Sequence, residues 1–169
     1  MEVLECRLAI DDLDAFVADL GKIGDRHEVT IQAVDARYVA DRPHLERAVE
    51  LADRAIEHGE NVARDRAVEI LLYAAGRRQI DRALEMGVGE GENRAAILID
   101  GGASGGDEAT AIEDLEELGA FLERTSTLAD SDAETLCEFF EITDAERGAT
   151  DASLSALVRE RVALLEVEK

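Results

Sequence analysis

The stretch AVEILLYAAGRRQIDRAL, residues 67–84, predicts two helices separated by a sharp break. Its first part is apolar apart from Glu69, which is typical of a helix that is buried on most of its surface. Gly76 fits a helix C-terminal cap in the left-handed conformation, because glycine has no Cβ to clash there. Gln79 and Ile80 begin a second, shorter helix, where free backbone amides point outward.

The same stretch is a positive island in an acidic chain. Residues 62–84 carry five arginines against three acids, whereas the whole chain carries 40 acids, 18 bases and a net charge of −22. Free amides at a helix start and arginine side chains both bind phosphate, and guanidinium groups also stack on bases. The stretch therefore predicts a contact for a polyanion, with solvated arginines on a turn as the alternative. The candidate residues are Arg77, Arg78 and Gln79, with Arg64 or Arg66.

Glu69 is the lone acid in the apolar run VEILLYAA. One interpretation places it on the single wet edge of the helix. The other buries it, and because a buried carboxylate without a partner is costly, it then pairs with an arginine. Arg66, Arg77 and Arg78 are the nearby choices, and such a pair would hold the arginine turn in place.

Composition favours one compact domain over residues 1–169, since 46% of the 169 residues are hydrophobic. Excess acid with only two lysines is typical of halophilic proteins, which work in a very salty cytoplasm; an acidic interaction surface is the alternative. Residues 1–84 have a net charge of −6 and residues 85–169 of −16, so the first half is the better candidate for nucleic acid. No signal peptide or membrane-spanning run is evident, which predicts a cytoplasmic protein.

The hydrophobic pattern predicts a mixed α/β fold: a small central sheet flanked by helices, with a helical C-terminal layer. We expect strands over 3–10, 29–33 and 95–99, and a short strand over 164–167. We expect helices over about 12–20 (ended by Gly21 and Gly24), 41–58 (capped by Asp41, with Pro43 in its first turn), 111–122, 132–141 and 152–162.

No residue pattern indicates an enzyme with its own active site. The three histidines lie near predicted element ends and lack catalytic spacing, and Cys6 and Cys137 predict neither a disulfide nor a zinc site. The loop GGASGG, residues 101–106, occupies the position of a phosphate loop. Its spacing matches neither of the phosphate-binding motifs GxGxxG and GxxxxGK[ST]. A nucleotide- or metabolite-binding regulator that uses this loop is the alternative function. A dimeric scaffold whose arginines only balance acids is a third.

Residues 68–100, VEILLYAAGRRQIDRALEMGVGEGENRAAILID, resemble the core of the small kinase-binding subunit of the KEOPS complex, the archaeal and fungal counterpart of the human PRPK-binding protein. The family pattern is a helix carrying Glu-Ile, a small-residue turn, a second helix with polar-Ile-x-x-Ala-apolar spacing, a glycine break and a strand. The matching residues are Glu69-Ile70, Ala75-Gly76, Gln79-Ile80, Ala83-Leu84, Gly87 and Ala95 to Ile99. Residues 157–167 are similar to the closing helix and strand of the family, and residues 104–149 depart most.

The resemblance implies a non-catalytic role. KEOPS makes threonylcarbamoyladenosine in tRNA, and its catalytic subunit and its small atypical kinase are other chains. The subunit that this chain resembles binds and activates the kinase and helps to recruit tRNA through the single-stranded CCA end. We therefore expect a regulatory subunit without cofactor or metal, with other KEOPS subunits as indirect partners and no membrane partner. A homodimer of the free protein is left open.

The acidic surface narrows the expected mode of tRNA binding. It repels duplex phosphates, and at about 1 M salt the Debye length is only ~3 Å, so close contacts must supply the affinity. Stacking and a few arginine forks suit unpaired terminal nucleotides. The expected tRNA contacts are Arg64, Arg66, Arg77, Arg78 and Gln79. The expected kinase contacts are Ile80, Leu84, Leu157 and Leu165, with core packing as the alternative for each, while Glu69 and Gly76 are expected to be structural.

Overall fold

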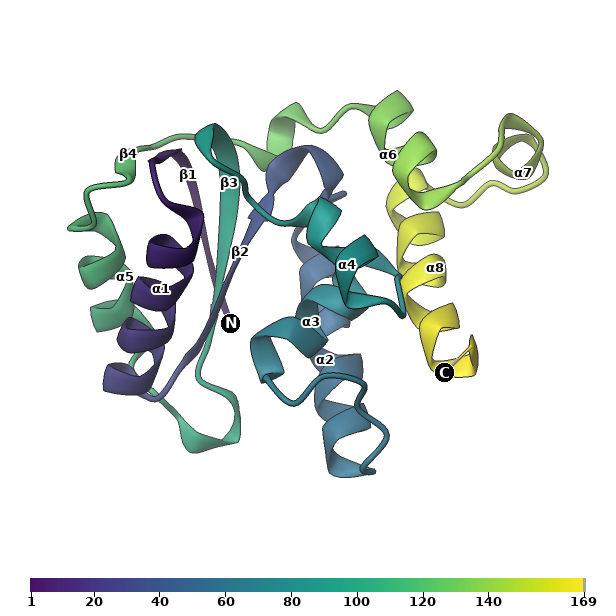
Figure 1. Ribbon diagram of the computed structural model, residues 1–169. Coiled ribbons are helices and arrows are strands. Elements are labelled where there is room, and N and C mark those ends of the chain that lie inside the picture. Colours follow the sequence, from purple (N-terminus) through teal and green to yellow (C-terminus); the bar gives the residue numbers. More distant parts are fainter. Residues whose placement is uncertain (169) are drawn as a thin grey trace. The chain divides into compact units, whose positions relative to one another are not determined.

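The computed structural model describes residues 1–168, without the side chains of residues 104, 130 and 166–168. The chain forms two compact units. The first, the sheet unit, comprises residues 1–35 and 87–127, and the second, the helical unit, comprises residues 36–86 and the chain from Leu128 on (Figure 1). The predicted mixed α/β class is confirmed, whereas the single domain over residues 1–169 stays a prediction.

The sheet unit is built on a four-stranded antiparallel sheet with the strand order β2-β3-β1-β4. Alternating apolar residues of β1 face a core that also takes in side chains of α1 and α5. Strand β3 pairs with β1 from Gly91 to Ile99 and is buried from Ala95 to Asp100, as its unbroken apolar run predicts. The elements are β1 (Glu2–Ile10), α1 (Leu13–His27), β2 (Thr30–Asp35), β3 (Gly91–Asp100), a 3-10 turn η3 (Gly102–Ser104), α5 (Glu108–Glu116) and β4 (Phe121–Arg124).

Helix α1 runs through both glycines that were expected to end it. A Cβ at Gly21 would meet no atom within 4 Å, so this glycine lies at an open position and does not interrupt the helix. At Gly24 a Cβ would lie 2.7 Å from the carbonyl oxygen of Val29, so the residue permits a close backbone approach. The helix ends at Glu28, which adopts the left-handed conformation with φ 57°. The predicted helix end was therefore wrong, because the helix tolerates Gly21 and uses Gly24 for close packing.

The expected helix over 111–122 is shorter than its pattern indicates. Helix α5 ends at Glu116, and Phe121–Arg124 form strand β4 at the edge of the sheet. Leu115 lies inward as expected, but Leu122 belongs to β4 and is exposed. Pairing of this segment with β1 depends on residues far away in the sequence, so the local pattern could not reveal it.

The helical unit is centred on α2 and α3, which pack against each other and against α8. Asp41 caps α2 by accepting a hydrogen bond from the backbone N–H of His44, and Pro43 lies in the first turn, both as predicted. The elements are the 3-10 turn η1 (Ala36–Tyr38), α2 (Arg42–Glu57), α3 (Arg66–Ala75), α4 (Ile80–Ala83), η2 (Leu84–Met86), η4 (Leu128–Asp130), α6 (Ala133–Phe140), α7 (Asp144–Gly148) and α8 (Leu154–Glu168).

The expected strand over 164–167 is wrong, because α8 continues as one helix to Glu168. Leu157, Val158, Val162 and Leu165 are all buried, which extends the helical stripe by one further turn. None of the helices in residues 1–168 combines the length and the apolar character that crossing a membrane requires.

Candidate nucleic-acid and protein interface

The arginine turn, defined as residues 76–79, connects α3 to α4. Gly76 has φ 62° and ψ 33°, and its N–H donates to the carbonyl oxygens of Leu72 and Tyr73. The left-handed cap that the sequence predicts is therefore present. Gln79 is the N-cap residue of α4, and its side chain makes no capping hydrogen bond.

The arginines of the positive island do not form one cluster. Arg64 and Arg66 lie at the start of α3, whereas Arg77 and Arg78 follow its end. A ten-residue helix is about 15 Å long at ~1.5 Å per residue. The island is therefore two separate basic sites at opposite ends of α3, which sequence proximity alone concealed.

Arg66 is committed to a partner within the helical unit. Its Nε donates to Oδ1 of Asp53 at 2.8 Å, and its Nη2 donates to Oδ2 at 2.9 Å. This two-pronged ion pair joins α2 to the first residue of α3. The ion pair uses Nε and Nη2 of the guanidinium group, and through it Arg66 holds the two helices together in this structure.

Arg77 is half-buried and is held by α6. Its Nη2 donates to the backbone carbonyl oxygen of Phe139, and its guanidinium carbon lies 5.0 Å from the centre of the Phe139 ring. The Nε atom of Arg77 is buried and has no hydrogen-bond partner among the described residues. The side chain is therefore turned toward α6, whereas those of Arg78 and Gln79 are exposed.

Glu69 is fully buried, so the wet-edge interpretation is wrong. Its Oε1 accepts hydrogen bonds from the backbone N–H groups of Val62 and Ala63, at 3.0 and 2.9 Å. These bonds fix the segment that precedes α3 and carries the exposed Arg64. The carboxylate thus shapes the basic site at the start of the helix.

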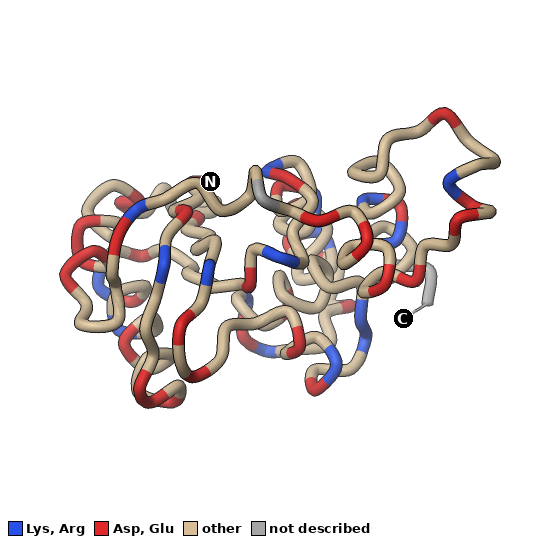
Figure 2. The backbone as a smooth tube through the Cα atoms, turned by 90° about the horizontal axis from the view of Figure 1, so that it is seen from above, with Lys and Arg blue, Asp and Glu red and all other residues tan. Residues whose placement is uncertain are grey.

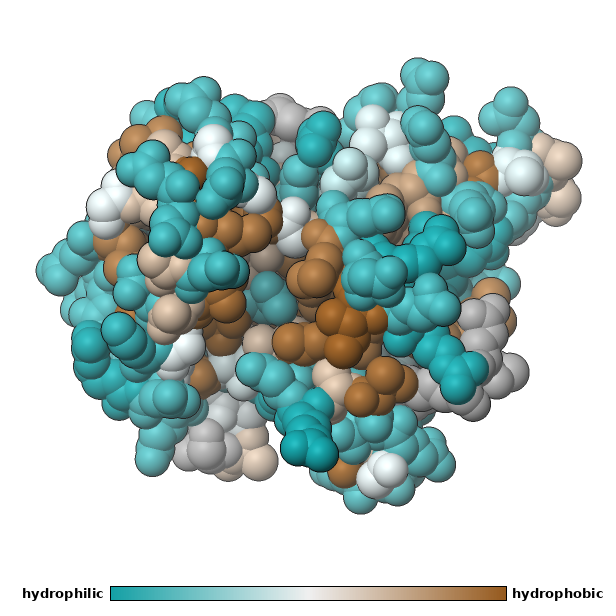
Figure 3. All heavy atoms as spheres, viewed as in Figure 1, coloured by the Kyte–Doolittle hydropathy of each residue, from teal (hydrophilic) through white to brown (hydrophobic). Residues whose placement is uncertain are grey.

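The four residues expected to meet a kinase fall into two classes. Ile80 and Leu84 are 43% and 57% exposed, and their spacing of four residues places them on the same side of the α4 turn. Leu157 and Leu165 are 4% and 1% exposed, which favours the alternative that they pack in the core. Leu164, which was expected to lie in a strand, is exposed on α8. Figure 3 shows apolar side chains gathered on the face over α3 and α4.

Charge is distributed unevenly along the chain. Residues 36–86 carry nine arginines against ten acids, whereas the rest of the chain carries nine bases against 30 acids. Figure 2 shows acids throughout both units, with basic residues set among them. The segment that contains α2, α3 and α4 is therefore the nearly neutral part of a strongly acidic molecule.

The glycine loop of residues 101–106 is occupied by the chain's own carboxylates. The N–H of Gly101 donates to Oε2 of Glu108 at 2.8 Å, and the N–H of Gly102 donates to Oδ2 of Asp100 at 3.1 Å. A Cβ at Gly106 would lie 2.0 Å from the carbonyl oxygen of Glu28, so this glycine permits tight loop packing. These contacts give the loop a structural role and leave its amides poorly placed for a phosphate.

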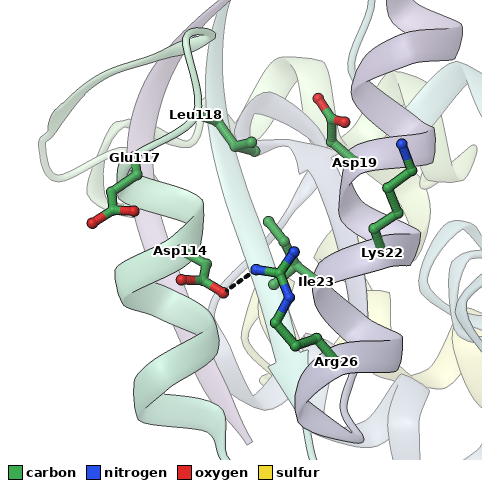
Figure 4. A pocket seen from close by; sticks show the side chains of 7 residues that line it. All are labelled: Asp19, Lys22, Ile23, Arg26, Asp114, Glu117 and Leu118. Carbon is green, nitrogen blue, oxygen red and sulfur yellow. Dashed lines mark hydrogen bonds and ion pairs between the residues drawn. The ribbon is translucent and has the colours of Figure 1, made fainter.

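A small pocket of the sheet unit lies between α1 and α5 (Figure 4). Nη1 of Arg26 lies 2.8 Å from Oδ2 of Asp114, and Nε2 of His27 lies 2.6 Å from the same oxygen. The hydrogen bond with His27, with help from Arg26, lowers the pKa of the Asp114 carboxyl below its ordinary value. His27 and Arg26 therefore clamp the end of α1 to α5. The pocket is lined by Asp19, Lys22, Ile23, Arg26, Asp114, Glu117 and Leu118.

His44 lies near the start of α2, as expected for a histidine beside an element end, but it is a core residue. It is fully buried, its Nδ1 accepts from the N–H of Ala40 at 3.1 Å, and its Nε2 lies 2.7 Å from the carbonyl oxygen of Ala74. The residue links the start of α2 to the end of α3, directly before the arginine turn. Across the part of the chain that the structure describes, no group of three histidine, cysteine or acidic side chains could hold a metal ion.

Exposed guanidinium groups and exposed apolar side chains thus occur together around α4. The candidate site is therefore this surface, and it is a candidate for binding. The sequence model of the family "Kinase binding protein CGI-121" matches residues 13–166. The chain therefore belongs to the CGI-121 family of kinase-binding proteins. No curated protein sequence gives a significant match.

Proposed function

We propose that this protein is the kinase-binding regulatory subunit of a KEOPS complex, and that it binds and activates the small atypical kinase of that complex. Membership of the CGI-121 family over residues 13–166 is the observation that carries the proposal. The subunit supplies no catalytic residue of its own, acts in the cytoplasm, and meets the other KEOPS subunits indirectly.

Ile80 of α4 and Leu84 of the following turn η2 are the best kinase contacts that the helical unit offers. Ile80 and Leu84 leave large apolar surfaces in water, and burial of such surface drives protein association. Asp81, Arg82 and Glu85, their neighbours in the sequence, add exposed polar groups. An apolar centre with a polar rim is typical of protein interfaces.

Copurification and a kinase assay test this part of the proposal. The small kinase should bind the protein and hydrolyse ATP faster in its presence. Leu84→Asp should weaken binding at least tenfold, because a charge would be buried without a partner. Val17→Asp is the matched control, since Val17 is 55% exposed but lies on α1 of the sheet unit. Equal loss in both variants would contradict a kinase contact at α4.

We further propose that Arg78 and Gln79, with Arg64 at the other end of α3, contact the single-stranded CCA end of tRNA. All three are exposed, and they belong to the nearly neutral segment 36–86. The acidity of the remaining chain disfavours a duplex, so short unpaired nucleotides held by guanidinium groups are the better fit. Arg66 and Arg77 support this surface from within the fold.

Binding of tRNA with and without its CCA end tests this second part. Removal of the three terminal nucleotides should reduce the affinity of the wild-type protein for tRNA strongly. In Arg78→Ala, the affinities for tRNA with and without the CCA end should differ much less. Equal affinity for the two tRNA forms would contradict the proposed contact. The kinase assay is independent of this result, because the kinase surface is tested through Leu84.

A further inference from the structure

Helix α6 ends in a cluster of arginine contacts that lie beside the arginine turn. The last four carbonyl groups of a helix have no partner within the helix and must be satisfied in some other way. The carbonyls of Cys137 and Glu138 accept from the backbone N–H groups of Ile142 and Glu141. The carbonyl of Phe140 accepts from Nε of Arg161 at 3.2 Å, and that of Phe139 accepts from Arg77.

Arg77 is thus fixed at both its backbone and its side chain. Its backbone N–H donates to the carbonyl oxygen of Leu72 at 3.0 Å and completes the cap of α3. Its guanidinium group lies over the Phe139 ring, which in turn stacks on Tyr38 with 4.6 Å between ring centres. A cation at a helix C-terminus is favoured by the helix dipole as well as by the hydrogen bond.

We infer that Arg77 is a positioning residue that ties the arginine turn to α6, and that α6 thereby sets the direction in which Arg78 and Gln79 face the nucleic acid. Gly76 adds to this junction, because a Cβ at this position would lie 3.5 Å from the carbonyl oxygen of Arg161. The acidic segment around α6, to which the sequence assigns no role, then supports the proposed RNA contact through Arg77. The inference rests on the proposed tRNA binding and assigns separate tasks to two neighbouring arginines.

Substitution by lysine separates the two tasks. Arg77→Lys keeps the positive charge but loses the planar group that both stacks on Phe139 and donates to its carbonyl. A contact with phosphate that depends on charge alone tolerates this change, whereas a contact that needs the planar group does not. We expect Arg77→Lys to lower the affinity for tRNA with a CCA end about fivefold to tenfold, a loss typical of one buried hydrogen-bonding interaction.

The salt dependence of binding distinguishes positioning from phosphate contact. Loss of one phosphate contact to a single strand reduces the slope of log K against log salt concentration by about 0.7. Arg78→Ala should reduce the slope by this amount, whereas Arg77→Ala, which also removes a charge, should lower affinity with the slope unchanged. Hydrogen exchange of the amides around residues 138–142 should quicken in Arg77→Lys and stay as in the wild type in Arg78→Ala.

Arg161→Lys provides a second, independent variant. It weakens the same end of α6 through Phe140 without altering the arginine turn, so it should also quicken exchange there and lower tRNA affinity at constant slope. Unchanged exchange in Arg77→Lys, or an equal drop in slope for Arg77→Ala and Arg78→Ala, would overturn the inference. A wild-type protein that binds no tRNA would instead refute the proposed tRNA binding, with the exchange data still deciding whether Arg77 anchors α6.

Discussion

His44 donates a hydrogen bond of 2.7 Å from Nε2 to the backbone carbonyl oxygen of Ala74. The direction of this bond follows from Nδ1, which accepts from the N–H of Ala40 and therefore carries no proton. The neutral ring joins the start of α2 to the last turn of α3. Protonation would place a charge in the core and replace the acceptor at Nδ1 by a second donor.

Stability should therefore depend on the protonation of His44. Burial lowers its pKa from 6.5 to about 4. Between these two pKa values the unfolded state binds more protons than the folded state. The contribution of neutral His44 to the free energy of unfolding is therefore complete above pH 6.5 and decreases as the pH falls toward 4, by ~3 kcal/mol in total. Denaturation at fixed salt should show this slope in the wild type and a weaker slope in His44→Gln. A difference between the two proteins that does not vary with pH would contradict the assignment.

Glu69→Ala should destabilise the protein by about 3 kcal/mol, because the N–H groups of Val62 and Ala63 would lose a charged acceptor. Glu69→Gln keeps an oxygen that can accept both bonds and should cost only ~1 kcal/mol. Chemical denaturation of the two variants measures the difference. Equal losses would show that the negative charge matters and the hydrogen-bond geometry does not.

The two glycines of α1 should respond to alanine in opposite directions. Gly21→Ala adds a methyl group in open space and should raise the free energy of unfolding by ~0.5–1 kcal/mol through helix propensity. Gly24→Ala places a Cβ 2.7 Å from a backbone oxygen and should lower it by about 2 kcal/mol, as expected for overpacking. Thermal unfolding of the pair provides its own control, since both substitutions lie in the same helix.

The ion pair between Arg66 and Asp53 should contribute a coupling energy of ~0.5–1 kcal/mol, the range for a partly exposed pair with good geometry. A double-mutant cycle with Arg66→Ala and Asp53→Ala measures it at low and at high salt. The coupling should shrink as the salt concentration rises. A coupling near zero at low salt would contradict a stabilising role for this pair.

Much of the fold was predictable because its signals are local. Asp41, Asp65, Gly76 and Asp132 end or begin helices through side-chain caps or a left-handed backbone, which depend on neighbouring residues only. The alternation along β1 and the apolar run of β3 also appear in the sequence directly. The family pattern from Glu69 to Ile99 belongs to this local level.

Long-range contacts decided the remaining features. Strand β4 exists because it pairs with β1, and Gly24 stays helical because Val29 approaches it, so neither follows from local pattern. Likewise, five arginines lie within one short stretch of the sequence, but the length of α3 separates them in the structure. Phe139, which is far away in the chain, binds the side chain of Arg77 through its carbonyl oxygen. Sequence by itself thus determined which residue types were available for binding. The tertiary structure decided which of them face solvent, because burial and partners depend on segments that only folding brings together.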